Sequence, residues 1–258
     1  MAFAYNGKRT RNIYKPGQTT AFRLSRSRIE NYMRCARCFY IDRRLGVDQP
    51  PGFPFNLNNA VDTLLKKEFD VHRVAKSAHP LFEHYGIKAV PFVHPQMNEW
   101  RENFKGVRTV HVPTNFEITG AVDDLWQLED GSLAVVDYKS TSKEGEVSLD
   151  APWQDGYKRQ MEIYQWLLRQ NGFDVSDTGY FVYVNGRTDL EAFDAKLEFD
   201  VKILSYSGSD AWIEGVLEEI KETLESDEMP PESSDCDYCL YRRHALNVIV
   251  GHVKSTKR

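Results

Sequence analysis

Residues 116–140, FEITGAVDDLWQLEDGSLAVVDYKS, contain the pattern that decides the fold of this chain. Apolar and polar residues alternate over 116–126, as in a strand with one buried face, and an apolar run follows at 133–136. The Asp130-Gly131 pair between the two runs is a strong signal for a tight turn. The stretch therefore predicts an antiparallel hairpin with strands over 116–126 and 133–139.

Three charged residues of this hairpin are candidates for chemistry. Asp137 and Lys139 are two positions apart on one strand, so their side chains leave the same face. The turn lies midway between Asp123 and Asp137, so the register brings these two carboxylates close together. Two carboxylates beside an ammonium suit Mg²⁺ or Mn²⁺, which can activate a water for phosphodiester hydrolysis. An ion pair between Lys139 and either aspartate explains the same residues without a metal.

The other expected elements place this hairpin in an α/β fold. A capping box at Ser27 and Glu30 starts the first helix, and Leu57, Val61, Leu64 and Leu65 form the apolar stripe of the second. We expect helices over 27–46, 56–73, 96–104, 153–171 and 210–226, and further strands over 180–184 and 197–204. This order predicts a small mixed sheet flanked by helices.

Two polar residues of the helix after the hairpin share one face. Gln160 and Tyr164 are four positions apart, and Tyr157, Met161 and Leu168 lie on the same side. Gln160 therefore points toward the sheet, either to support the charged residues or as a polar residue at the rim of an ordinary core helix.

The four cysteines form two C-x-x-C pairs near opposite ends of the chain, Cys35/Cys38 and Cys236/Cys239. In a reducing compartment such pairs favour a metal or an iron–sulfur cluster over disulfides. A shared metal would tie the first helix to the C-terminal region. Four unrelated buried thiols are the alternative, and His244 is either an additional ligand or a surface histidine.

The ordered set Gly120-x-x-Asp123, Asp137-x-Lys139 and Gln160-x-x-x-Tyr164 resembles the RecB branch of the PD-(D/E)XK nuclease superfamily. The resemblance implies a restriction-endonuclease-like core with a central mixed sheet. It also implies that Asp123 and Asp137 coordinate the metal, that Lys139 is catalytic, and that Gln160 and Tyr164 support the site or contact DNA.

The cysteines extend the resemblance to nucleases of the AddB and CRISPR-adaptation kinds, which hold a 4Fe–4S cluster with one N-terminal and three C-terminal cysteines. The run from Ser25 to Cys35 is similar to the entry to that first cysteine. The present chain divides its cysteines two and two, so 4Fe–4S, 2Fe–2S and Zn²⁺ all stay open.

Many relatives also carry a metal-binding histidine on the helix before the hairpin, in a G-x-x-x-H motif that is absent here. Asp62 stands in the matching register. Glu68 falls within the apolar stripe of Leu57, Val61 and Leu64, where a buried carboxylate would need a partner. Both acids are therefore candidate metal ligands.

The 258 residues suffice for one well-buried core, and their net charge of −5 is unevenly distributed. Residues 1–47 hold eleven Lys or Arg and two acids, a local charge of +9. We expect a basic, flexible or loosely docked arm over 1–24, one nuclease domain over 25–244 and a tail over 245–258. The candidate phosphate contacts of this basic segment are Arg23, Arg26, Arg28 and Arg34.

The leading hypothesis is a Mg²⁺- or Mn²⁺-dependent nuclease that hydrolyses DNA, with partner proteins of recombination, repair or CRISPR adaptation. A catalytically silent, metal-stapled nucleic-acid-binding or assembly subunit on the same fold is the alternative. An electron-transfer iron–sulfur protein explains only the cysteines. No run approaches the roughly 20 apolar residues of a membrane span, and no signal-peptide pattern is present, so we expect a cytoplasmic protein.

Overall fold

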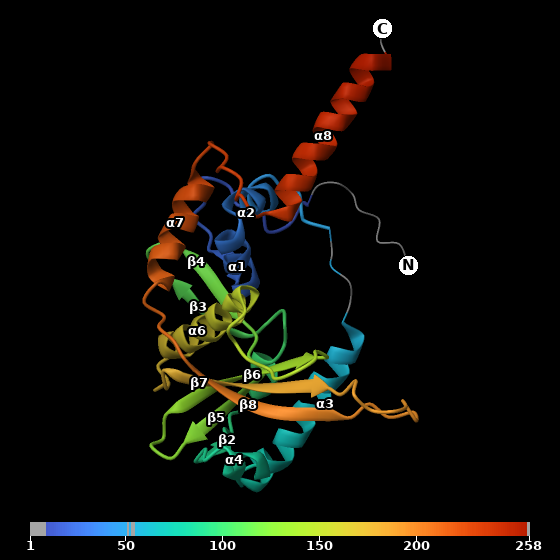
Figure 1. The fold of residues 1–258 in the computed structure, drawn as a ribbon. Helices are drawn as coiled ribbons and strands as arrows, with labels where there is room; N and C mark the ends of the chain where they lie inside the picture. The colour runs from blue at the N-terminus through green and yellow to red at the C-terminus, as the bar shows by residue number, and fades with distance from the viewer. Residues whose placement is uncertain (1–8, 51, 53–54, 257–258) are drawn as a thin grey trace. The chain divides into compact units, whose positions relative to one another are not determined.

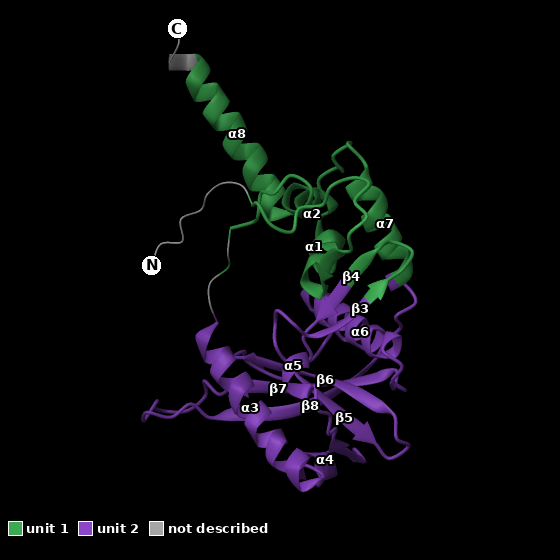
Figure 2. Cartoon of the chain, turned by 180° about the vertical axis from the view of Figure 1, so that it is seen from behind, with its two compact units in different colours: residues 1–52, 110–117, 214–258 green, residues 53–109, 118–213 purple. Residues whose placement is uncertain are grey.

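The computed structural model describes residues 9–50, 52 and 55–256. The chain divides into two compact units, each made of separate stretches of sequence (Figure 2). Unit 1 contains residues 1–52, 110–117 and 214–258, and unit 2 contains residues 53–109 and 118–213. The α/β class expected from the sequence is confirmed.

Unit 2 is built on a five-stranded sheet in the order β2-β5-β6-β7-β8. Its strands are β2 (Ala89–Pro91), β5 (Asp124–Leu128), β6 (Leu133–Thr141), β7 (Thr178–Gly186) and β8 (Phe199–Ser207). The pair β6–β7 is parallel and the other neighbours are antiparallel. The expected small mixed sheet is confirmed. β7 includes the strand expected over 180–184, and β8 overlaps the strand expected over 197–204 but begins two residues later.

Helices cover both faces of this sheet (Figure 1). On one face, Phe69 of α3 (Asn56–Ala75) packs against Tyr138 of β6, with ring centroids 5.7 Å apart. On the other face, Gln160 of α6 (Asp155–Gln170) bonds to Asp137 of β6. Successive residues of β6 thus face different helices. The short elements α4 (Pro80–His84), α5 (Met97–Trp100) and η1 (Pro152–Gln154) complete the helices of unit 2 in the described chain.

The hairpin between β5 and β6 has the predicted register. Asp124 is opposite Val136, so Asp123, one residue before β5, comes level with Asp137. Gly131 adopts φ 90° in the turn, a conformation that favours glycine. The continuous strand predicted over 116–126 is wrong, however. β4 (Phe116–Gly120) belongs to another sheet, and the Val122 N–H donates to the Trp100 carbonyl between the strands.

The second predicted helix is confirmed as α3, but its buried face differs from the prediction. Val61, Leu65, Phe69 and Arg73 are buried at four-residue spacing. Leu57 and Leu64, which we placed in the apolar stripe, are 59% and 62% exposed. The predicted stripe is therefore wrong for Leu57 and Leu64 and right for Val61 and Leu65. Several apolar residues within one short window are compatible with more than one buried helix face.

Unit 1 contains β1 (Phe22–Ser25), α1 (Arg26–Arg34), α2 (Ala36–Arg43) and α8 (Asp237–Thr256), and most of α7 (Ile213–Glu225). The sheet that includes β4 has the order β1-β4-β3, with β3 at Val107–His111. The single helix expected over 27–46 is two helices, because Cys35 is extended with φ −163° and ψ 103°. The N-cap is Ser25 rather than Ser27.

The ends of the chain also differ from expectation. Tyr14 and Phe22 are buried and pack edge to face at 5.2 Å, so residues 9–24 are not a loosely docked arm. The expected tail continues as helix α8 to Thr256. Residues 1–8 and 257–258 lie outside the described residues. In the described part of the chain, each helix is too short or too polar to cross a bilayer.

Candidate functional site

A pocket of about 300 Å³ in unit 2 gathers several of the candidate residues. We call it the carboxylate pocket. Asp62 and Lys66 of α3 line it, together with Asp123 before β5 and Lys139 on β6. Its polar and aromatic lining is completed by Asn58, Asn59, Arg101, Asn103, Tyr138, Ser140 and Tyr157.

The hairpin and α6 bring the three central charged residues together. Asp123 Oδ2 accepts a hydrogen bond from the N–H of Tyr138 at 2.9 Å. Tyr138 directly follows Asp137, so this bond holds the Asp123 carboxylate against that part of β6. Asp137 is fully buried, and its Oδ1 accepts from Gln160 Nε2 at 2.6 Å. The Lys139 ammonium pairs with the other oxygen of Asp137 and lies 3.4 Å from Gln160 Oε1. The predicted ion pair of Lys139 is therefore present.

Gly120 and Tyr164 are linked to these residues by packing. Gln160 Nε2 donates to the Tyr164 hydroxyl at 3.1 Å. A Cβ on Gly120 would lie 2.7 Å from Tyr164 Cε1 and 2.9 Å from Leu167 Cδ1. Only a glycine lets this part of the chain approach α6 so closely. This contact explains why a glycine stands at position 120 opposite Tyr164.

Lys66 connects Asp62 to Asp123 within the carboxylate pocket. The Lys66 ammonium is 2.8 Å from Asp62 Oδ1 and 3.2 Å from Asp123 Oδ1. Burial raises the pKa of Asp62, as does the charge of Asp123. Burial lowers the pKa of Lys66, but Asp123 and Asp62 outweigh this effect and raise it, so the lysine stays charged. Lys66 is not among the residues predicted from the sequence, although its i+4 spacing from Asp62 places it on the same helix face.

Glu68 is not among the residues that line the carboxylate pocket. Its carboxylate accepts from His79 at 3.0 Å. Glu68 is six residues after Asp62, which at about 100° per residue turns it roughly 120° away around α3. The structure therefore brings Asp62 to the pocket and not Glu68. The stripe that suggested Glu68 included Leu57 and Leu64, which are exposed.

A buried ionic network beside Asp123 escaped the sequence interpretation. Asp124 is fully buried and accepts from the Tyr138 hydroxyl at 2.8 Å, and it also pairs with Arg73 and with Arg101. Arg101 Nε donates to the Asp123 carbonyl at 2.9 Å, so the network fixes the backbone from which Asp123 projects. Its members come from α3, from the residue that follows α5 and from the hairpin, and no local spacing connects them.

The oxygen donors of the carboxylate pocket are of the type that hard divalent cations bind. Asp62 and Asp123 line the pocket with carboxylate oxygens, the ligands that Mg²⁺ and Mn²⁺ prefer. Asp137 is fully buried and is joined to the pocket by its ion pair with Lys139. A positive group, the Lys66 ammonium, already lies between Asp62 and Asp123. The site thus stabilises positive charge at the place where a cation would bind.

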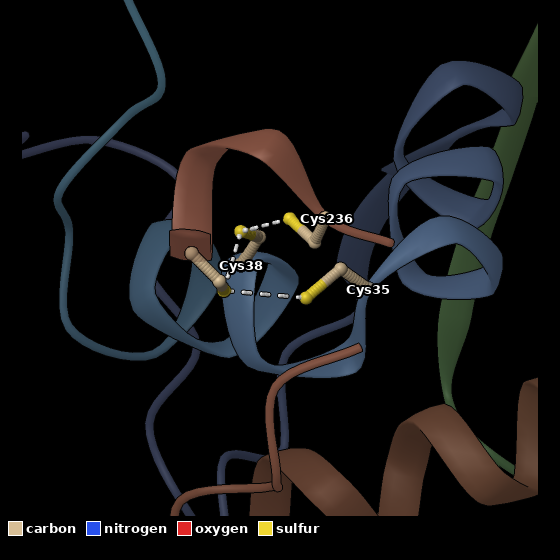
Figure 3. A group of neighbouring side chains, drawn as sticks. Cys35, Cys38 and Cys236 are labelled. Carbon is tan, nitrogen blue, oxygen red and sulfur yellow. Dashed lines mark hydrogen bonds between the residues drawn. The ribbon is translucent and has the colours of Figure 1, made fainter. Parts of the chain in front are cut away.

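The four cysteines converge in unit 1 (Figure 3). Their Sγ atoms all lie within 4.8 Å of one another, and among the described residues this is the group of His, Cys, Asp and Glu that could hold a metal. Burial raises the pKa of Cys35, but hydrogen bonds from Ser233 and Cys38 outweigh it and lower the pKa to about 6. Burial and the neighbouring thiols raise the pKa of Cys38. His244 is exposed and is not part of the group.

The four arginines expected to contact phosphates have different surroundings. Arg28 lies 3.0 Å from the buried carboxylate of Asp42, and Arg23 lies 3.8 Å from Glu117. Arg26 is half-buried and Arg34 is exposed. The charge of Arg28 is therefore largely neutralised within unit 1, whereas Arg34 presents its guanidinium to solvent.

Comparisons with known proteins identify the family. One solved structure, titled "Crystal structure of SSO0001", is 15% identical over 85% of this chain and 84% of that chain, with a TM-score of 0.35. No curated protein matches. The family model described as the PD-(D/E)XK nuclease superfamily matches residues 23–244. Because that match covers most of the sequence, the chain belongs to the PD-(D/E)XK nuclease superfamily.

Proposed function

We propose that the protein is a RecB-type, Mg²⁺- or Mn²⁺-dependent nuclease that hydrolyses the phosphodiester bonds of DNA. The observation that carries the proposal is the contact of Lys139 with both Asp137 and Gln160, in a chain whose Lys139 and Asp123 line one pocket. A RecB-type nuclease would act in recombination, repair or CRISPR adaptation, together with partner proteins of those processes.

Asp123 and Asp137 would hold the divalent cation, with Asp62 as a further oxygen ligand from α3. When bound, the cation supplies Lewis-acid stabilisation of the phosphate and lowers the pKa of a water. Gln160 keeps the Asp137 carboxylate and the Lys139 ammonium in fixed positions through its amide.

Lys139 would orient the attacking water and stabilise the negative charge that develops on the phosphate. Its ammonium also lies 4.4 Å from the centroid of the Tyr157 ring, an attractive arrangement that restricts its motion. Asp137, Gln160 and Tyr157 therefore hold this lysine from three sides before any substrate binds.

Unit 1 would contribute contacts to the DNA backbone. Arg34 is the strongest of the four candidates because it is exposed, and Arg28 is the weakest because Asp42 and Asp48 lie within 3.5 Å of it. Phosphate contacts of this kind make DNA binding weaken steeply with salt.

The test compares the parent protein with Lys139→Met on single-stranded DNA, duplex DNA and RNA, each with Mg²⁺ or Mn²⁺. We expect the parent to cut DNA and the variant to cut about 100-fold to 1,000-fold more slowly, as for loss of a group that stabilises the transition state. The variant should bind DNA as tightly as the parent. Lys67→Met, which changes an exposed lysine of α3, is the matched control and should cut normally.

The alternative is a silent subunit that binds nucleic acid and uses the nuclease fold as a scaffold. The observation that favours it is Lys66, whose ammonium occupies the space between two of the three carboxylates. A folded parent protein that binds DNA but leaves DNA and RNA uncut with either cation would support this alternative and contradict the nuclease proposal.

A further inference from the structure

We infer that the four cysteines hold a single tetrahedral ion, Zn²⁺, and that Arg242 is the residue that stabilises the charge of this centre. The inference concerns unit 1 and is independent of the proposed nuclease activity. It also differs from the 4Fe–4S cluster that the RecB-type resemblance implies, because the arrangement of the sulfur atoms does not fit a cluster.

The separations between the sulfur atoms carry the argument. The Sγ atoms of Cys38 and Cys236 are 3.4 Å apart, those of Cys38 and Cys239 are 3.6 Å apart, and those of Cys35 and Cys239 are 3.7 Å apart. Four thiolates at about 2.3 Å from one zinc ion form a tetrahedron with edges of roughly 3.8 Å. These three edges are within a few tenths of an ångström of that value, and all six lie within 4.8 Å.

An iron–sulfur cluster requires a wider arrangement. In a 4Fe–4S cluster each thiolate binds a different iron at the corner of a cube, so the cysteine sulfurs stand farther apart than ligands of one ion. In a 2Fe–2S cluster two thiolates share each iron, which gives two close pairs that are far from each other. Here three close contacts connect the four sulfur atoms in series: Cys35 to Cys239, Cys239 to Cys38, and Cys38 to Cys236.

The two C-x-x-C pairs have the same position relative to the helices that follow them. Cys35 immediately precedes α2 and Cys38 lies in its first turn, while Cys236 immediately precedes α8 and Cys239 lies in its first turn. In both cases the fourth residue after the first cysteine, Phe39 or Leu240, donates its N–H to that cysteine's carbonyl. Two helix N-termini thus meet at the sulfurs, where their positive ends stabilise thiolates.

Arg242 gives the site a charge partner. Its Nη2 lies 3.2 Å from Cys38 Sγ and 3.1 Å from Cys239 Sγ. Four thiolates around Zn²⁺ leave a net charge of −2, and the guanidinium offsets half of it while donating hydrogen bonds to two of the ligands. Arg243, the next residue, pairs with Glu232 instead and supplies a natural control.

The first experiment identifies the metal. The full chain is purified without oxygen from cells supplied with both iron and zinc, and its metals and acid-labile sulfide are measured. We expect one zinc per chain and no sulfide, and we expect Co²⁺ to replace the zinc with the visible spectrum of a tetrahedral thiolate site. Iron with sulfide in a ratio of four to four or two to two, a single iron, or no bound metal would each overturn the inference.

The second experiment tests Arg242 through metal affinity rather than activity. We expect Arg242→Met to weaken zinc binding about 10-fold to 100-fold in competition with a chelator of known affinity, as for other partners of metal ligands. Arg242→Lys should recover part of the loss, and Arg243→Met should bind zinc like the parent. Equal zinc affinities for Arg242→Met and Arg243→Met would remove Arg242 from the site.

Discussion

The cysteine site of unit 1 and the carboxylate pocket of unit 2 differ in how complete they are. In the first site the four Sγ atoms lie within 4.8 Å of one another, and Cys35, Cys38 and Cys239 are buried. In the second, lysine ammonium groups lie among the carboxylates, and the Asp123 side chain is 23% exposed at a pocket. The sulfur atoms are thus largely enclosed, whereas the carboxylate pocket is open to solvent.

Under our two proposals, this contrast corresponds to two different uses of metal. A structural metal has its full set of protein ligands, whereas a catalytic metal keeps positions for water and substrate. Zinc would therefore tie α2 to the start of α8, between residues up to 204 positions apart in sequence. A divalent cation in the carboxylate pocket would bind more weakly and exchange with solvent.

The largest effect should follow removal of the zinc. Structural zinc contributes on the order of 10 kcal/mol to the folding of small zinc-binding peptides, so its loss should release the segments that it joins. We expect amide hydrogens of α2 and of the first turns of α8 to exchange rapidly after chelation, measured by mass spectrometry. The buried strand β6 in unit 2 is the internal reference and should keep its protection. Unchanged protection in α2 would show that the cysteines are not a structural site.

A smaller effect is expected where Gly120 meets Tyr164. The Cβ of Gly120→Ala would lie 2.7 Å from Tyr164 Cε1, so α6 must shift and carry Gln160 with it. Overpacking of this kind typically costs about 1–3 kcal/mol in the free energy of unfolding, measured by urea denaturation.

The matched control for Gly120 is Gly215→Ala in α7. A Cβ on Gly215 would meet no heavy atom within 4 Å, so this change should be neutral or stabilise the protein by up to roughly 1 kcal/mol. If both alanine variants unfold at the same urea concentration as the parent, the close packing of Gly120 on α6 is not a constraint.

The smallest effect concerns Lys66. Its ammonium competes with a divalent cation for Asp62 and Asp123. An interaction of about 1 kcal/mol corresponds to roughly fivefold in affinity, so Lys66→Met should bind Mn²⁺ several-fold more tightly in a titration followed by electron paramagnetic resonance. Lys67→Met should match the parent. Weaker Mn²⁺ binding by Lys66→Met would mean that Lys66 supports the cation site instead of competing for it.

The parts of the site that could be predicted from the sequence depend on local geometry. The position of the turn, midway between Asp123 and Asp137, predicts the observed register in which these two residues are level. The two-residue period of a strand predicts that Asp137 and Lys139 share one face. The i+4 spacing of Gln160 and Tyr164 likewise placed both side chains toward the sheet, where they are hydrogen-bonded to each other. Each of these inferences used only distances along one or two neighbouring elements.

The parts that could not be predicted depend on contacts between distant segments. At the break between β4 and β5 the Val122 N–H donates to the Trp100 carbonyl, which lies more than 20 positions earlier in the chain. The Arg73–Asp124–Arg101 network joins three segments. The buried face of α3 was misjudged because the packing partners of that helix, and not its own apolar pattern, determine which residues are covered. Helix α8 escaped detection because Leu246, Val248 and Ile249 are exposed, so no amphipathic period marks it.

The most direct test of the account is the cation dependence of DNA cleavage by zinc-loaded protein, for the parent and for Asp137→Asn. The account predicts that the parent cuts only when Mg²⁺ or Mn²⁺ is added, and that Asp137→Asn cuts at least about 100-fold more slowly while it keeps one zinc per chain. Cleavage by the parent without added Mg²⁺ or Mn²⁺, or an Asp137→Asn variant as fast as the parent, would contradict the assignment of the carboxylate pocket as the catalytic site.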